Sequence, residues 1–171
     1  MKHLLQVCIV TLLYFVFSND VIAQTCKPTL PQAFVNTTYA LPSGKTITVN
    51  SGGNLQAAID QANLGDIIEL QAGATFTGNF ILRKKTGSGW IYIRSSKESA
   101  LPAPGTRITP TDAVNMAKVL SAGQVSAFAT VAGAYNYRLI GLEIGLPTSV
   151  NDQFTLVSFG SGSETKLSDL P

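Results

Sequence analysis

The clearest pattern along the chain is an apolar stripe at helical spacing that gives way to alternation at strand spacing. Apolar residues recur at i, i+3, i+4 and i+7 in Leu55, Ala58, Ile59 and Ala62. Asn54 is a suitable N-cap and Gly65 suits the position just beyond a helix C-terminus, so a short helix is predicted over residues 55–63. The period then changes to two over residues 67–70, which predicts a strand with Ile68 and Leu70 on one face.

Short apolar runs separated by glycine or polar turns predict further strands on both sides of this helix. They lie at 46–49, 67–70, 79–82, 89–93, 125–131, 138–144 and 154–158. Ile68 and Ile93 are 25 positions apart, which suits one turn of a solenoid built from three short strands. Each strand would then pair in parallel with its own copy in the next turn.

The interval 97–123 interrupts this rhythm. Residues 101–105 predict a turn, and Thr111 can cap a short helix over 112–120. Its apolar side would consist of Val114, Met116, Ala117 and Leu120. We therefore expect an excursion that packs a small helix on the outside of the solenoid.

Alternation also predicts which side chains face the core. In the strand over 138–144 we expect Ile140, Leu142 and Ile144 to point inward, with Ile140 stacked on Ile68 and Ile93. Arg138 and Glu143 would then be exposed on the outer surface.

The first 23 residues have the pattern of a secretory signal peptide. A positive start at Lys2 and His3 precedes an apolar run, and small or medium residues stand before a cleavage site after Ala23. The mature chain would begin at Gln24, with a proline-containing extended leader over 24–45 and a folded domain over 46–171. We expect export, either as a secreted protein or to the periplasm or cell surface, with no stable membrane insertion after cleavage.

Export also removes residues that could carry chemistry. Cys8 and His3 would leave with the signal peptide, so Cys26 would have no partner for an intrachain disulfide and imidazole-based catalysis would be excluded. Charged residues make up 13% of the chain and the net charge is +2, which gives no reason to expect a nucleic-acid partner. The remaining carboxylates are scattered (Asp112, Glu143 and Asp152 among them), and no catalytic, cofactor-binding or metal-ligating residue is assigned.

Three surface features leave alternatives open. Residues 83–85 (Arg-Lys-Lys) are either a solvated turn or a contact for an acidic polysaccharide. Trp90 and Tyr92 share the outer face of their strand, as a sugar-stacking platform or as a partly buried surface under the long loop. Arg138 and Glu143 are either ordinary surface or part of a substrate groove.

Several of these segments together resemble a known family. The glycine pair at 52–53, the Ala-rich helix, Gly65-Asp66 with its following strand, and residues 72–78 resemble the N-terminal cap and first coil of secreted right-handed parallel β-helix proteins of the pectate-lyase-like superfamily. Residues 89–96 and 137–144 resemble later strands, so the resemblance covers roughly 48–145. It implies an all-β, single-stranded right-handed parallel β-helix with a short helix capping its N-terminal end.

The resemblance also implies polysaccharide as the partner. Residues 163–171 contain no closing strand or cap, so we expect the N-terminal part of a longer protein, truncated at its C-terminus, with any catalytic residues of a lyase or hydrolase on later coils. The alternative is a non-catalytic secreted scaffold or adhesin, because this fold supports many unrelated functions.

Overall fold

The computed structural model describes residues 41–160, and the predicted signal peptide, most of the leader and Cys26 lie outside them. The described chain is mostly β. Its helical elements are α2 (Leu55–Gln61), η1 (Glu98–Ala100) and η2 (Pro110–Asn115). Its strands are β1 (Thr46–Val49), β2 (Ile67–Leu70), β3 (Thr75–Thr77), β4 (Phe80–Leu82), β5 (Ile91–Ser95), β6 (Ala117–Leu120), β7 (Phe128–Thr130), β8 (Tyr137–Ile140), β9 (Leu142–Gly145) and β10 (Val157–Ser158).

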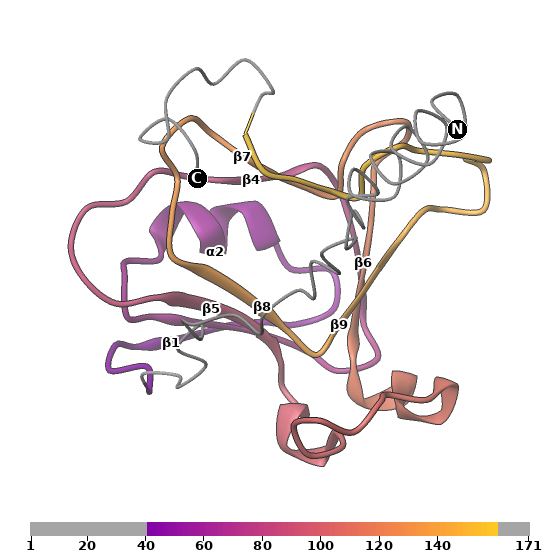
Figure 1. Ribbon diagram of the computed structural model, residues 1–171, viewed down its shortest axis with the longest axis horizontal. Coiled ribbons are helices and arrows are strands. Elements are labelled where there is room, and N and C mark those ends of the chain that lie inside the picture. The colour runs from indigo at the N-terminus through magenta and orange to yellow at the C-terminus, as the bar shows by residue number, and fades with distance from the viewer. Residues whose placement is uncertain (1–40, 161–171) are drawn as a thin grey trace, which may run out of the picture. The chain divides into compact units, whose positions relative to one another are not determined.

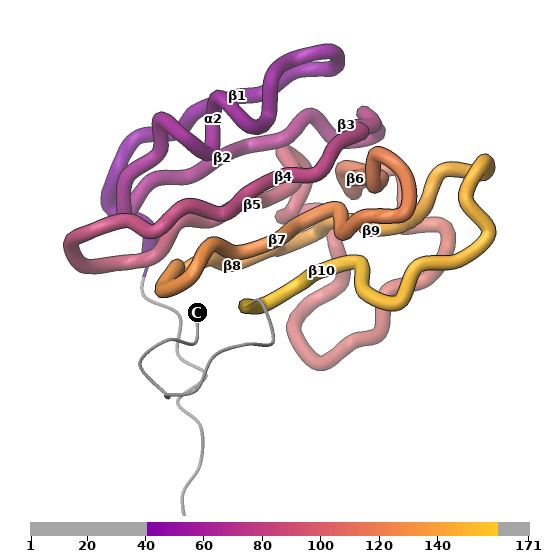
Figure 2. Tube along the Cα trace, turned by 90° about the horizontal axis from the view of Figure 1, so that it is seen from above, coloured from indigo at the N-terminus to yellow at the C-terminus, as the bar shows by residue number. Residues whose placement is uncertain are grey.

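The strands form three parallel sheets. The first sheet has the order β1-β2-β5-β8, the second β3-β6-β9 and the third β4-β7-β10. From β2 onward the chain visits the first, second and third sheet in turn, and it does so three times; we call each visit to all three sheets a pass. Figure 1 shows the sheets on separate sides of the view, and Figure 2 shows the passes stacked from β1 to β10. The predicted parallel pairing and the 25-residue step from Ile68 to Ile93 are confirmed.

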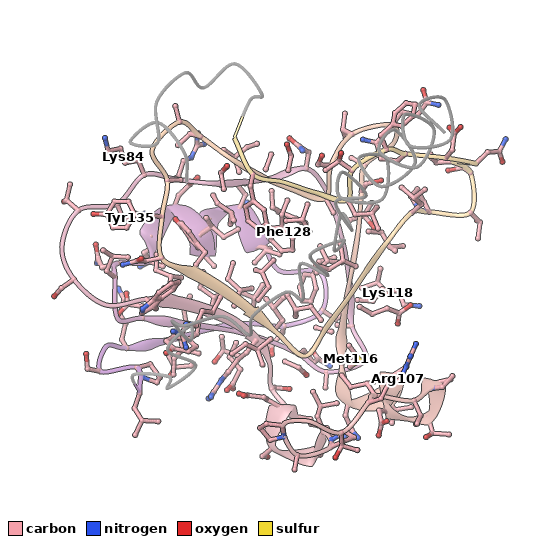
Figure 3. All side chains as sticks on the ribbon, viewed as in Figure 1. Lys84, Arg107, Met116, Lys118, Phe128 and Tyr135 are labelled. Atoms are coloured by element: carbon pink, nitrogen blue, oxygen red, sulfur yellow. The ribbon has the colours of Figure 1, made fainter. Side chains whose placement is uncertain are left out.

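The apolar faces of the three sheets form one core. Phe128 on β7 is completely buried and points into the space between the sheets, whereas Lys118 on β6 lies on the outside (Figure 3). Phe128 contacts Phe80 of the previous pass with ring centroids 5.7 Å apart. Other fully buried positions are Ile59, Ile68, Leu70, Ile91, Ile93, Ala117 and Val119.

Helix α2 covers one end of this stack, as predicted. The Asn54 side chain accepts a hydrogen bond from Ala57 N at 2.9 Å, which confirms the N-cap. The helix ends earlier than predicted, because Ala62 is already extended and Gly65 is not its terminating residue. Gly65 instead has a positive φ of 101°, and an added Cβ on the neighbouring Gly89 would approach its backbone nitrogen to 3.3 Å. The positive φ therefore favours glycine at position 65, and a positive φ together with this close approach favours it at position 89.

Asp66 lies in the turn between the helical segment and β2. Its Oδ1 accepts from Lys45 N and its Oδ2 accepts from Asn63 N, each at 2.9 Å. The carboxylate is buried and ties together the chain before β1 and the end of the helical segment.

The predicted helix over 112–120 is wrong. The 3₁₀-helix η2 ends at Asn115, and residues 117–120 form β6, which pairs with β3. Thr109 is the N-cap, in place of Thr111, and its backbone N–H donates to Asp112 Oδ2 at 2.8 Å. Pro110 fits the first turn of a helix, but Ala117 and Val119 alternate inward with Lys118 outward, and burial in the second sheet decides their conformation.

The single strand predicted over 138–144 is also wrong, and so is its first inward position. Gly141, with a φ of 63°, separates β8 from β9 and turns the chain from the first sheet into the second. Leu139 pairs with Ile93 and packs against the core, whereas Ile140 pairs with Arg94 on the opposite face. The inward orientation of Leu142 and Ile144 is confirmed.

Candidate functional site

A cavity of about 220 Å³ lies where the chain passes from the third sheet back to the first. Its walls come from the connections before β5 and β8, from β4, β7 and β8, and from the residue after β10. The lining residues are Leu82, Trp90, Thr130, Ala134, Tyr135, Asn136, Tyr137 and Phe159. Four of these eight side chains are aromatic, and we call this cavity the aromatic pocket.

Two of the aromatic side chains remain open to solvent. Phe159 has 67% of its surface exposed and Tyr135, in the connection before β8, has 36%. Tyr135 lies in the same region as Lys84 in Figure 3. Exposed rings beside a hollow are unusual in a soluble protein, since aromatic side chains generally gain by burial. The two rings therefore lie on the solvent-facing side of the pocket.

Tyr137 is anchored at the start of β8. Its hydroxyl donates to Arg83 O at 2.7 Å, and burial raises its pKa to about 12. The phenol is therefore neutral at ordinary pH and acts as a fixed wall of the pocket.

Asn136 joins the segment before β8 to the segment before β5. Asn136 has a φ of 61°, the only non-glycine residue with positive φ in the part of the chain that the structure describes. Its Nδ2 donates to Gly89 O at 2.8 Å, and its carbonyl accepts from Ile91 N at 2.9 Å. Trp90 lies between those two contacts, so Asn136 holds the tryptophan segment beside the start of β8.

Arg138 stacks on the aromatic side chains of the neighbouring strand. Its guanidinium carbon lies 4.3 Å from the centre of the Trp90 ring and 5.5 Å from that of Tyr92. The shared face predicted for the two rings is confirmed by this common contact. Tyr92 is buried, which rules it out as a stacking platform, whereas Trp90 reaches the pocket. The prediction that Arg138 is exposed is wrong. Pairing of β5 with β8 places its half-buried side chain over these rings.

The basic run at 83–85 mainly holds helix α2. Arg83 forms an ion pair with Asp60 at 2.9 Å, and Lys85 Nζ donates to Asp60 O at 2.7 Å. The hydrogen bond from Arg83 lowers the pKa of Asp60 below its usual value. Lys84 is exposed next to Gly133 and does not line the pocket.

The scattered carboxylates are not brought together. Glu143 pairs with Lys118 at 3.0 Å, and Asp112 caps η2, where hydrogen bonds from Thr109 lower its pKa. Neither these two nor Asp152 line the aromatic pocket. Within residues 41–160 no group of three or more His, Cys, Asp or Glu side chains could hold a metal ion.

The sequence points to Trp90 and Arg138 separately but does not join them into a site, and it gives no indication of Phe159. The signal available was the run Tyr135-Asn136-Tyr137-Arg138, where an asparagine between aromatic residues suggests a turn that presents rings. Phe159 follows a strand of two residues and had no such signal.

No protein-family model matches this chain, and comparisons with curated proteins and with solved structures gave no significant match either. In the described residues no helix is long and apolar enough to span a membrane.

Proposed function

We propose that this chain belongs to a secreted, right-handed parallel β-helix protein of the pectate-lyase-like kind, and that it binds polysaccharide. Three parallel sheets visited in a fixed order and the helix across one end support the fold. The sequence pattern of residues 1–23 supports export.

The aromatic pocket carries the functional part of the proposal. A pyranose ring has a face of C–H groups and a rim of hydroxyls, so it matches an aromatic wall with a few polar groups beside it. Trp90, Tyr135 and Phe159 supply such a wall, and Thr130 and Asn136 supply the polar groups. The volume of about 220 Å³ is below that of ordinary drug-sized sites, and it suits one sugar ring.

The pocket supports binding more directly than catalysis. Its eight lining residues include no carboxylate, the group that glycoside hydrolysis requires in pairs. Binding without reaction is also what a secreted scaffold or adhesin would need. An enzyme would use this pocket to hold the polymer while its reactive groups came from elsewhere.

Fluorescence offers a direct test, because Trp90 is the only tryptophan in the chain. We expect soluble oligosaccharides of plant and microbial polymers to give a saturable change in Trp90 emission. Tyr135→Ala and Phe159→Ala should each weaken binding by about three- to tenfold, the usual value of one aromatic contact.

Phe154→Ala is the matched control, since Phe154 is fully exposed and does not line the pocket. It should bind like the parent. If Phe154→Ala weakened binding as much as Phe159→Ala, or if no oligosaccharide changed the emission, the proposal would be wrong.

A further inference from the structure

We infer that the aromatic pocket selects an uncharged sugar ring over an acidic one; this inference rests on the proposed function. It follows from the charges that the structure places in and near the pocket. None of the eight lining side chains is charged.

The nearest basic side chains already have defined partners or lie outside the lining. Arg138 stacks on Trp90 and Tyr92 from the strand face, and it is not among the lining residues. Arg83 and Lys85 both contact Asp60 of α2. Among residues 41–160, the pocket therefore has no cation in its walls to pair with a carboxylate.

A uronic acid would lose binding energy in such a site. Its carboxylate would leave water to lie among Leu82, Ala134 and aromatic rings without a counter-charge. A neutral hydroxymethyl group at the same ring position costs less to desolvate and can bond to hydroxyl or amide groups. Thr130, Tyr135 and Asn136 supply neutral groups of this kind.

The open mouth indicates how a polymer would enter. Tyr135 and Phe159 are the exposed rings, and the cavity behind them has room for about one ring. A chain end or a side branch of a neutral polysaccharide would therefore place a single sugar in the pocket, with the following residues across Tyr135 and Phe159.

The test compares oligosaccharides that differ only in charge. Trp90 emission is titrated in the full chain with β-linked hexamers of glucose, galactose and mannose, and with the same hexamers oxidised at C6 to uronic acids. We expect at least one neutral hexamer to bind about tenfold more tightly than its oxidised counterpart. Its affinity should be unchanged in about 0.5 M NaCl, because no ion pair contributes.

Lys84→Gln provides the control for nearby charge and should leave neutral binding unchanged. Tighter binding of an oxidised hexamer, weakened by salt or by Lys84→Gln, would overturn this inference and leave the proposed function intact. Absence of binding by every hexamer would count against the proposed function itself. The two failures are therefore distinguishable.

Discussion

The end of the stack covered by α2 and the pass formed by β8, β9 and β10 differ in what covers the backbone groups of their edge strands. At the α2 end, the Gln56 side chain bonds both backbone groups of Ile81, with distances of 2.7 Å to its N–H and 3.1 Å to its carbonyl oxygen. A side chain thus replaces a neighbouring strand along the edge of β4. In the pass of β8, β9 and β10 no such replacement is seen among the described residues, and these strands are the edges of their sheets (Figure 2).

Burial of paired positions in successive strands of the first sheet, which we call a column, shows the consequence. Ile68 and Ile93 are fully buried, whereas Leu139, which pairs with Ile93 in the same register, is only partly buried. Phe128 and Val157 differ in the same way in the third sheet. The same apolar position is therefore worth more where a pass lies on both sides of it, as nearest-neighbour stacking requires.

The largest effect should come from truncating matched positions in that column. Ile93→Ala should lower the free energy of unfolding by about 3 kcal/mol, because it leaves a cavity between two passes. Leu139→Ala should cost about 1 kcal/mol, since its side chain is already partly in solvent. Denaturant unfolding of both variants measures the difference. Equal losses would mean that burial in this column does not depend on the neighbouring pass.

A smaller effect should come from removing the side chain that covers the edge of β4. Gln56→Ala should cost about 1–2 kcal/mol, because both backbone groups of the half-buried Ile81 lose their partner. Gln61→Ala is the matched control: it lies exposed on the same helix and should be neutral. A loss as large in Gln61→Ala would place the effect in the helix itself and not in the edge of β4.

The regular parts of this comparison could be predicted from the sequence. The helix after Asn54 follows from short-range periodicity. The pairing of Ile68 with Ile93 follows from a spacing of 25 residues, which suits one turn of a solenoid. β3 has one apolar residue, Phe76, between two threonines, which is too little alternation to predict a strand. β6 was hidden by apolar residues that also fit helical spacing, and only its pairing with β3 decides between the two.

The candidate site could not be predicted in the same way, because the strands that form it are separated by more residues than one regular step of the stack. Ile93 and Leu139 are 46 positions apart, against 25 for the previous step, since the excursion with η1 and η2 lies between them. Without that register, Arg138 cannot be placed over Trp90. Simple alternation with Leu142 and Ile144 predicts that Ile140 points inward. Gly141 lies between Ile140 and Leu142, and its positive φ reverses the alternation, so this prediction fails.

The smallest expected effect is the change in the free energy of unfolding with pH, which should differ between the two ends of the stack. Asp60, on α2, has a lowered pKa, so its ion pair with Arg83 stabilises the fold above the ordinary carboxylate pKa, and that stability is lost as the pH falls through the folded-state value. Because both side chains are largely exposed, the loss should be small.

Tyr137, on β8, responds in the opposite direction. Its pKa of about 12 in the folded state exceeds the ordinary value of 10.0, so its contribution is complete below pH 10 and is lost as the pH rises toward 12. Solvent screening of this half-buried group reduces the loss to about 1 kcal/mol. Denaturant unfolding measured from pH 7 to pH 11.5 should show a steeper decline for the parent than for Tyr137→Phe, which has no phenol to ionise. Asp60→Asn, measured from pH 7 down to about pH 3, should flatten the acid side. On the alkaline side it should change the decline only slightly, because burial is the largest cause of the raised Tyr137 pKa and the Asp60 charge is a lesser one. If Tyr137→Phe kept the full alkaline decline in the free energy of unfolding, another group would be responsible for that decline. The pH dependence would then not distinguish the last pass from the α2 end.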